Sequence, residues 1–169
     1  MKRNILLLGL AMASCSAAPQ PPKRATFEAE ARALDGDTVA VDFRLLGVDA
    51  FERRQLCERA NACWQCGKTA QDFAARALRD KTAIIQLTPS TSYGRPVAVV
   101  TVDGEDLGEM MIRAGLAVPE GKYLHRDPER ASRYEAAFTQ AEAKRAGALA
   151  GRWIAPSKWR HGERLACER

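Results

Sequence analysis

The spacing of the apolar residues changes along this chain, and these changes limit the folds that it can adopt. Residues 26–34 alternate apolar and polar side chains, which is typical of a half-buried strand. Further predicted strands are residues 38–41, 43–48, 83–87 and 96–102. The predicted helices are residues 67–80, residues 106–115 and a segment that begins at Asp127-Pro128. Strands and helices are partly segregated, which favours an α+β domain built on a small barrel.

Two of these segments carry further local signals. Gly115 is expected to end the second helix, and the third helix has a predicted buried face made of Tyr134, Ala137, Phe138 and Ala141. The basic residues of the third helix are predicted to form a solvated face; they are Arg130, Arg133, Lys144 and Arg145. Residues 52–67 are predicted to be a polar loop.

The first 25 residues are predicted to lie outside the folded domain. Residues 1–15 combine a basic start, a short apolar run and a small-residue boundary, which is typical of a secretory signal. The favoured interpretation is a lipoprotein signal with Cys15 lipidated, which predicts a periplasmic or cell-surface lipoprotein; ordinary cleavage near Ala18 and secretion is the alternative. Residues 16–25 form a Pro-rich linker, and residues 26–160 and 161–169 are the predicted domain and C-terminal tail. Loss of Lys2 and Arg3 would lower the net charge from +5 to +3, a mildly basic domain.

Four cysteines remain if Cys15 is lipidated, and outside the cytoplasm they favour disulfides. Cys57, Cys63, Cys66 and Cys167 allow three pairings. Zinc binding at Cys63-x-x-Cys66 is a weaker alternative, because a second pair with ligand spacing is missing from the sequence. A redox motif is also less favoured, since no βαβ unit surrounds it.

Acidic residues gather at the ends of two predicted strands. Asp37 begins one strand, and Asp49 and Glu52 follow the next; Asp35 is nearby. Clustered carboxylates repel one another unless a cation joins them, and a hard ion such as calcium prefers oxygen ligands. The cluster therefore suggests a metal site, with a solvated rim of surface acids as the alternative.

Two arginines accompany these acids. Arg44 lies between them inside a strand, and Arg95 follows Tyr93-Gly94 at the start of another. A guanidinium binds phosphate through paired hydrogen bonds, and a carboxylate can deprotonate an attacking water. Acids, arginines and a metal are together what phosphodiester hydrolysis requires.

The sequence resembles the staphylococcal nuclease, or thermonuclease, family. The matching segments are ALDGDT, FRLLGVDAFE, YGRPVAVV and GEMMIRAGLA, in the order found in the family, and the resemblance covers roughly residues 26–153. It implies a five-stranded OB-fold-type β-barrel with three α-helices. It also implies endonuclease activity on DNA and RNA that leaves 3′-phosphate ends. Single strands are the expected substrate, and a monomer is the expected state.

The resemblance implies roles for individual residues near the acids. Asp37 and Asp49 would be calcium ligands together with the carbonyl of Ala50, and Asp35 would lie just outside this ligand set. Glu52 would be the general base that activates water.

The remaining implied roles concern the nucleic acid. Arg44 and Arg95 would bind the scissile phosphate and stabilise the transition state. Tyr93 would flank the nucleotide, and Tyr123 would stack on a base or hold a phosphate. The resemblance also favours a Cys57–Cys66 disulfide in the loop after Glu52, which leaves Cys63 to pair with Cys167.

Three departures from the family pattern affect these expectations. Phe51 stands where the family has proline, so packing of Phe51 would have to anchor the turn before Glu52. Only residues 39–43 separate Thr38 from Arg44, which could change the register of the strands. Thr91-Ser92 replaces charged residues before Tyr93, so that substrate affinity could be lower.

The tryptophans and histidines are predicted to be structural or solvated. Trp153 and Trp159 are expected to pack the C-terminal segment onto the domain, and Trp64 to pack over a disulfide. His125 and His161 are expected at the surface. Two alternatives to a nuclease remain: a non-catalytic OB-type module that binds nucleic acid or protein, and an envelope structural lipoprotein.

Overall fold

The structure, a computed structural model, describes residues 26–168. The predicted signal, the linker and Cys15 lie outside the described residues. Helices and strands are both present in that part of the chain, which confirms the α+β class. Within it, no helix is long and apolar enough to span a bilayer.

The largest sheet is built on the hairpin of β7 (Ala83–Ser92) and β8 (Arg95–Val102). Tyr93 and Gly94 make its two-residue turn, with φ of 51° and 74°. Positive φ at both central positions suits the twist of paired strands. β3 (Arg44–Leu45) pairs in parallel with β8, and β9 (Glu105–Asp106) pairs with the other end of β8. The strand predicted over residues 83–87 is thus longer than expected.

A second pair of strands carries the acidic turn. β4 (Val48–Ala50) is antiparallel to β10 (Ala117–Pro119), with Asp49 opposite Val118. Another two-stranded sheet, the hairpin of β5 (Cys57–Arg59) and β6 (Ala62–Trp64), lies in the segment predicted as a loop. Ala60 and Asn61 form its turn at positive φ, a geometry that residue types alone did not indicate because Asn61 is followed by no glycine.

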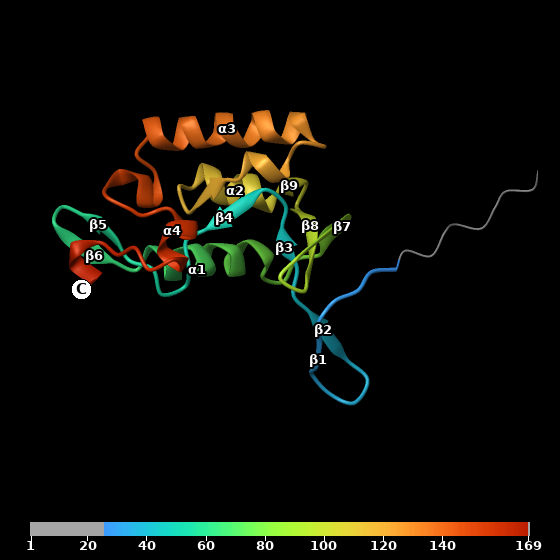
Figure 1. Ribbon diagram of the computed structural model, residues 1–169. Coiled ribbons are helices and arrows are strands. Elements are labelled where there is room, and N and C mark those ends of the chain that lie inside the picture. The colour runs from blue at the N-terminus through green and yellow to red at the C-terminus, as the bar shows by residue number, and fades with distance from the viewer. Residues whose placement is uncertain (1–25, 169) are drawn as a thin grey trace, which may run out of the picture.

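The N-terminal hairpin stands apart from the rest of the molecule. β1 (Ala31–Ala33) pairs only with β2 (Val39–Val41) among the described strands, and the loop between them points away from β4 (Figure 1). β1 is exposed along its length, so the prediction of a half-buried strand over residues 26–34 was wrong.

Across residues 26–168 the strands form four separate sheets rather than a closed barrel. The expected five strands and three α-helices are also not confirmed, since the same part of the chain holds ten strands and four α-helices. The short link explains part of this difference. Only Asp42 and Phe43 separate β2 from β3, and neither has the positive φ that a tight reversing turn needs. The chain therefore runs on from β2 to β3 instead of folding back as a hairpin.

The helices begin where the sequence predicts. α2 (Leu107–Arg113) starts at Asp106, whose carboxylate accepts hydrogen bonds from the amides of Gly108 and Glu109. α3 (Pro128–Ala143) starts at Asp127, whose carboxylate accepts a hydrogen bond from the amide of Arg130. Each cap satisfies backbone donors that the first helical turn leaves free.

Three helices are stacked against the sheets. α2 lies between α1 (Cys66–Leu78) and α3 (Figure 1). The predicted face of α3 is confirmed, with Phe138 half-buried and the other members buried. The core between these elements includes Val48, Phe51, Ile112, Leu124 and Tyr134.

The C-terminal segment returns to the β5–β6 hairpin. It contains α4 (Pro156–Arg160), which the sequence did not predict. Short 3-10 helices precede and follow α4, at Gly147–Ala150 and Ala166–Glu168, and another, Gly121–Tyr123, lies between β10 and α3. Disulfides join Cys57 to Cys66 and Cys63 to Cys167, the pairing expected from the resemblance. The second disulfide attaches the tail to the loop that follows Glu52.

Candidate active site

Asp49 and Glu52 lie at the end of β4 and in the turn after it. Asp49 is 3% exposed, and Glu52 is about one-third exposed. The turn is held by Gln55, which is fully buried. Its side-chain Oε1 accepts from the Glu52 backbone amide at 3.1 Å, and its backbone amide donates to the Glu52 carbonyl at 2.7 Å. Gly67 packs so closely on that carbonyl that a Cβ atom there would overlap it. The position of Glu52 is therefore set by neighbours on both sides.

Phe51 anchors the same turn by packing, as expected for a residue that stands where the family has proline. Its side chain is 3% exposed and meets Trp153 edge to face, with ring centroids 5.8 Å apart. Trp153 also meets Phe138 of α3 in the same manner. The prediction that Trp153 packs the C-terminal segment onto the domain is confirmed, and this packing supports the acidic turn.

Arg160, at the end of α4, lies between the two acids. Its Nη1 donates to Asp49 Oδ1 and to Glu52 Oε1, both at 2.8 Å, and its Nη2 donates to Asp49 Oδ2 at 3.0 Å. The hydrogen bond to Asp49 is the main cause that raises the pKa of Arg160 above its usual value, and Glu52 adds to it against partial burial. One guanidinium thus pairs with both carboxylates.

Arg44 contacts the same acid. Its Nη2 lies 3.3 Å from Asp49 Oδ1, and its side chain is 25% exposed. On the sheet Arg44 is opposite Val97, and Arg95 lies two residues earlier in β8. Since side chains alternate along a strand, Arg44, Val97 and Arg95 share one face of the sheet. Arg95 is half-buried and forms no ion pair with any residue between 26 and 168.

A cavity of about 340 Å³ opens beside Arg44. Its lining includes Arg44, Val97, Tyr93, Tyr123 and His125. Tyr93 is 89% exposed and Tyr123 is 58% exposed, so both rings are accessible to a ligand. His125 is exposed as expected, with Nδ1 3.4 Å from the Lys122 carbonyl. A second cavity of about 460 Å³ shares Tyr123 and His125 with the first and is lined further along by Arg126.

Asp35 and Asp37 are not brought to this site. Both are exposed in the loop between β1 and β2, where Asp35 Oδ1 accepts from the Asp37 amide at 3.2 Å. Hydrogen bonds from Thr38 and Asp37 lower the pKa of Asp35. The predicted carbonyl ligand, Ala50, lies in β4 opposite Ala117.

The carboxylate oxygens in this arrangement are not placed to coordinate a calcium ion. Both Asp49 oxygens accept hydrogen bonds from Arg160, Glu52 accepts from the same guanidinium, and Asp37 lies in the loop of the β1–β2 hairpin. Over residues 26–168 there is no group of three or more His, Cys, Asp or Glu side chains placed to hold a metal ion. A calcium ion normally needs six to eight oxygen ligands.

Comparison with known families identifies the domain. Residues 42–149 match the family of staphylococcal nuclease homologues. The chain belongs to this family. A search of curated proteins found no match. The nuclease match contains Arg44, Asp49, Glu52 and Arg95, whereas Asp37 precedes it and Arg160 follows it.

Arg160 and Gln55 are the residues of this nuclease-family site that sequence reasoning missed. Pro156 could have indicated a short helix, because proline is favoured in the first turn. No local signal indicates that the arginine at the end of that helix would face an acid 111 residues earlier. Gln55 lay in a segment predicted as a loop, where its burial was not foreseen.

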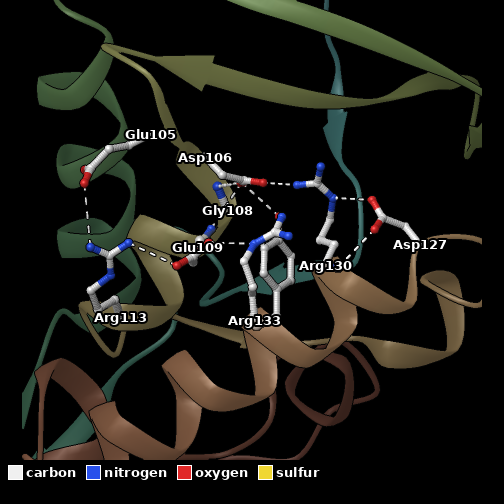
Figure 2. Close-up of polar contacts among 9 residues, drawn as sticks. Glu105, Asp106, Gly108, Glu109, Arg113, Asp127, Arg130 and Arg133 are labelled. Carbon is white, nitrogen blue, oxygen red and sulfur yellow. Dashed lines mark hydrogen bonds and ion pairs between the residues drawn. The ribbon is translucent and has the colours of Figure 1, made fainter.

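A second charged cluster joins α2, α3 and β9, away from the acidic turn. Figure 2 shows Arg130 between Asp106 and Asp127, and Glu109 between Arg113 and Arg133. Arg130 is only 12% exposed, so its prediction as part of a solvated face was wrong. The hydroxyl of Tyr134 donates to Asp106 at 2.9 Å, and burial raises the pKa of Tyr134. With its charges paired within the cluster, this region holds the helices together.

Proposed function

We propose that this protein is a nuclease-type hydrolase that cleaves phosphodiester bonds of DNA or RNA. The observation that carries the proposal is the position of Arg44. It lines the cavity that Tyr93 and Tyr123 flank, and it also contacts Asp49 beside Glu52. A phosphate held by Arg44 would therefore lie close to a carboxylate suited to general-base catalysis.

The chemistry assigned to this chain uses its own side chains. Arg44 and Arg95 bind the phosphate and offset the charge that develops on it, and Glu52 takes a proton from the attacking water. The two exposed tyrosines stack on bases, which favours single strands because their bases are accessible. Endonucleolytic cleavage with 3′-phosphate products is part of the proposal through the family resemblance.

The family resemblance also implies calcium dependence, which a comparison of cleavage with calcium and with EDTA tests. Because the donors do not fit the ion in the arrangement described, no step of the mechanism is assigned to calcium here. If the ion binds, it would supply positive charge next to the phosphate.

The proposal includes export from the cytoplasm, with a lipid anchor at Cys15 or secretion after ordinary cleavage. Two disulfides support it, since such bonds persist mainly in oxidising compartments. The proposed molecule is a monomer.

The test is degradation of single-stranded DNA and RNA by the mature protein, first with calcium and then with EDTA. Glu52→Gln is expected to abolish cleavage while binding remains, and Lys158→Ala, an exposed change on α4, is expected to behave as the unaltered protein. Negligible cleavage by the unaltered protein under both conditions would reject the proposal.

A second candidate is a non-catalytic binding module. The specific observation in its favour is that Arg160 donates hydrogen bonds to both acids. One Glu52 oxygen, Oε1, is therefore already engaged and cannot take a proton from water. In that case oligonucleotides would bind near Arg44, and Glu52→Gln would alter neither binding nor cleavage.

A further inference from the structure

Asp49 and Glu52 converge on one cation position, and a side chain of the protein fills it. We infer that Arg160 is the built-in cation of this pair and excludes a divalent ion from between the two carboxylates. The inference rests on the proposed function in one respect, since it takes these acids as those of the nuclease centre. It concerns metal binding, which can be measured without any cleavage.

The geometry of the contact supports this assignment. A single atom, Arg160 Nη1, is 2.8 Å from one oxygen of each acid, so the two oxygens face a common point. Nη2 takes the other Asp49 oxygen at 3.0 Å. A divalent ion would need these same oxygens, and it could not approach a guanidinium that carries the same sign of charge. Binding of the ion and the Arg160 contact are therefore mutually exclusive.

Burial makes a cation at this position necessary for the folded protein. Asp49 is 3% exposed, and an ionised carboxylate that is buried without a partner is strongly disfavoured. Arg44 is a second partner, but it makes one longer contact of 3.3 Å. Arg160 provides the paired, bidentate interaction that a buried carboxylate requires.

The segment that carries Arg160 is fixed to the loop after Glu52 at several points. The Gln55 side chain donates to the Ile154 carbonyl at 2.7 Å, just before α4. After α4, Glu168 Oε1 accepts from Trp159 Nε1 at 2.9 Å and from the Leu56 amide at 3.1 Å. Because both ends are held to the same loop, Arg160 is placed at the acids without depending on α4 alone.

The disulfide between Cys63 and Cys167 adds a covalent attachment next to these contacts. Cys167 is adjacent to Glu168, and Cys63 lies in β6 of the same loop. This disulfide limits how far the C-terminal segment can separate from the acidic turn. The inference therefore also predicts that loosening this attachment makes the cation position more available.

Isothermal titration calorimetry with calcium chloride tests the inference on the mature full-length protein. Arg160→Gln is expected to bind one calcium ion per molecule at least tenfold more tightly than the unaltered protein. Lys158→Ala, on the same helix and exposed, is expected to match the unaltered protein. Equal calcium affinity of the unaltered protein and Arg160→Gln, or no calcium binding by Arg160→Gln, would overturn the inference.

A second variant covers the case in which Arg160→Gln does not fold. The double change Cys63→Ser with Cys167→Ser keeps Arg160 and is expected to bind calcium severalfold more tightly than the unaltered protein; unchanged affinity would count against the inference. The outcome is separable from the proposed function. Absence of cleavage in every variant rejects the nuclease, whereas calcium-dependent cleavage with equal affinities rejects only the role of Arg160.

Discussion

Arg160 and Asp49 form a two-pronged ion pair between residues 111 positions apart in the chain, with N–O distances of 2.8 and 3.0 Å. The pair connects the C-terminal helix with the acidic turn of the nuclease domain. It also places a positive charge on a carboxylate that is almost completely buried. Stability and metal access at this site are thus linked through one side chain.

Arg160→Gln is expected to destabilise the protein by about 2 kcal/mol, because it removes the main partner of a buried carboxylate while Arg44 remains. The measurement is the midpoint of urea unfolding, with Lys158→Ala as the control. An unchanged midpoint would mean that Arg44 and water satisfy Asp49 without Arg160.

Phe51→Pro restores the family pattern before Glu52, yet we expect it to destabilise the protein by more than about 3 kcal/mol. The change removes a buried ring that packs on Trp153, and it removes the hydrogen bond from the Phe51 amide to the Leu116 carbonyl. Phe51→Leu keeps the amide and most of the volume, so a smaller loss is expected. Thermal unfolding of both variants provides the comparison. A Phe51→Pro protein as stable as the unaltered one would contradict the anchoring role of Phe51.

Tyr134 should make the stability depend on pH in alkaline solution. Burial raises its pKa in the folded protein above the ordinary value of 10.0, so the folded state keeps a proton that the unfolded state loses. The contribution of Tyr134 is therefore complete below pH 10 and decreases as the pH rises above it. Tyr134→Phe should show less loss of unfolding free energy between pH 9 and about pH 11.

Tyr134→Phe should also be less stable than the unaltered protein at neutral pH, where Tyr134 does not titrate. Measurements at neutral and alkaline pH therefore separate the hydrogen bond from the titration. Loss of the hydrogen bond to Asp106 should lower the unfolding free energy by about 1–2 kcal/mol. Identical pH profiles for both proteins would show that Tyr134 does not titrate differently in the two states.

The two disulfides should stabilise the protein by different amounts. They close segments with sequence separations of 9 and 104, and the entropy of the unfolded chain predicts about 2–3 and about 4–5 kcal/mol respectively. The double serine variants of each pair can be compared by urea unfolding. A larger effect for the Cys57–Cys66 pair would show that packing in the core, where both sulfurs are buried, outweighs chain entropy.

Tyr93→Ala should weaken binding of a single-stranded oligonucleotide by about tenfold, because stacking on a base is worth about 1–3 kcal/mol. The side chain is 89% exposed, so the thermal stability should stay the same. Fluorescence anisotropy at low salt measures the affinity. Tyr93→Phe, which keeps the stacking ring, and Ile84→Ala, which alters another exposed apolar residue, should both bind as the unaltered protein does. Equal loss in all three variants would exclude a specific stacking role.

Local patterns predicted the elements that depend on neighbouring residues. The helix that starts at Asp127-Pro128 and the buried face around Tyr134 were both predicted, since capping and helical spacing act within a few residues. The β5–β6 hairpin was missed because its turn residues, Ala60 and Asn61, are a weak signal for positive φ. The closed barrel was expected from the family resemblance and was not found in the described part of the chain, where β2 and β3 remain in separate sheets.

The sequence by itself determined the α+β class, the membership of the nuclease family and the candidate residues Arg44, Asp49, Glu52 and Arg95, because all of these follow from spacing and motifs within short segments. Only the tertiary structure decided which charges meet. It leaves Asp37 on a separate hairpin and brings Arg160 to the acids. The physical reason is that a buried carboxylate must find a partner, and the partner that packing supplies can come from any part of the chain.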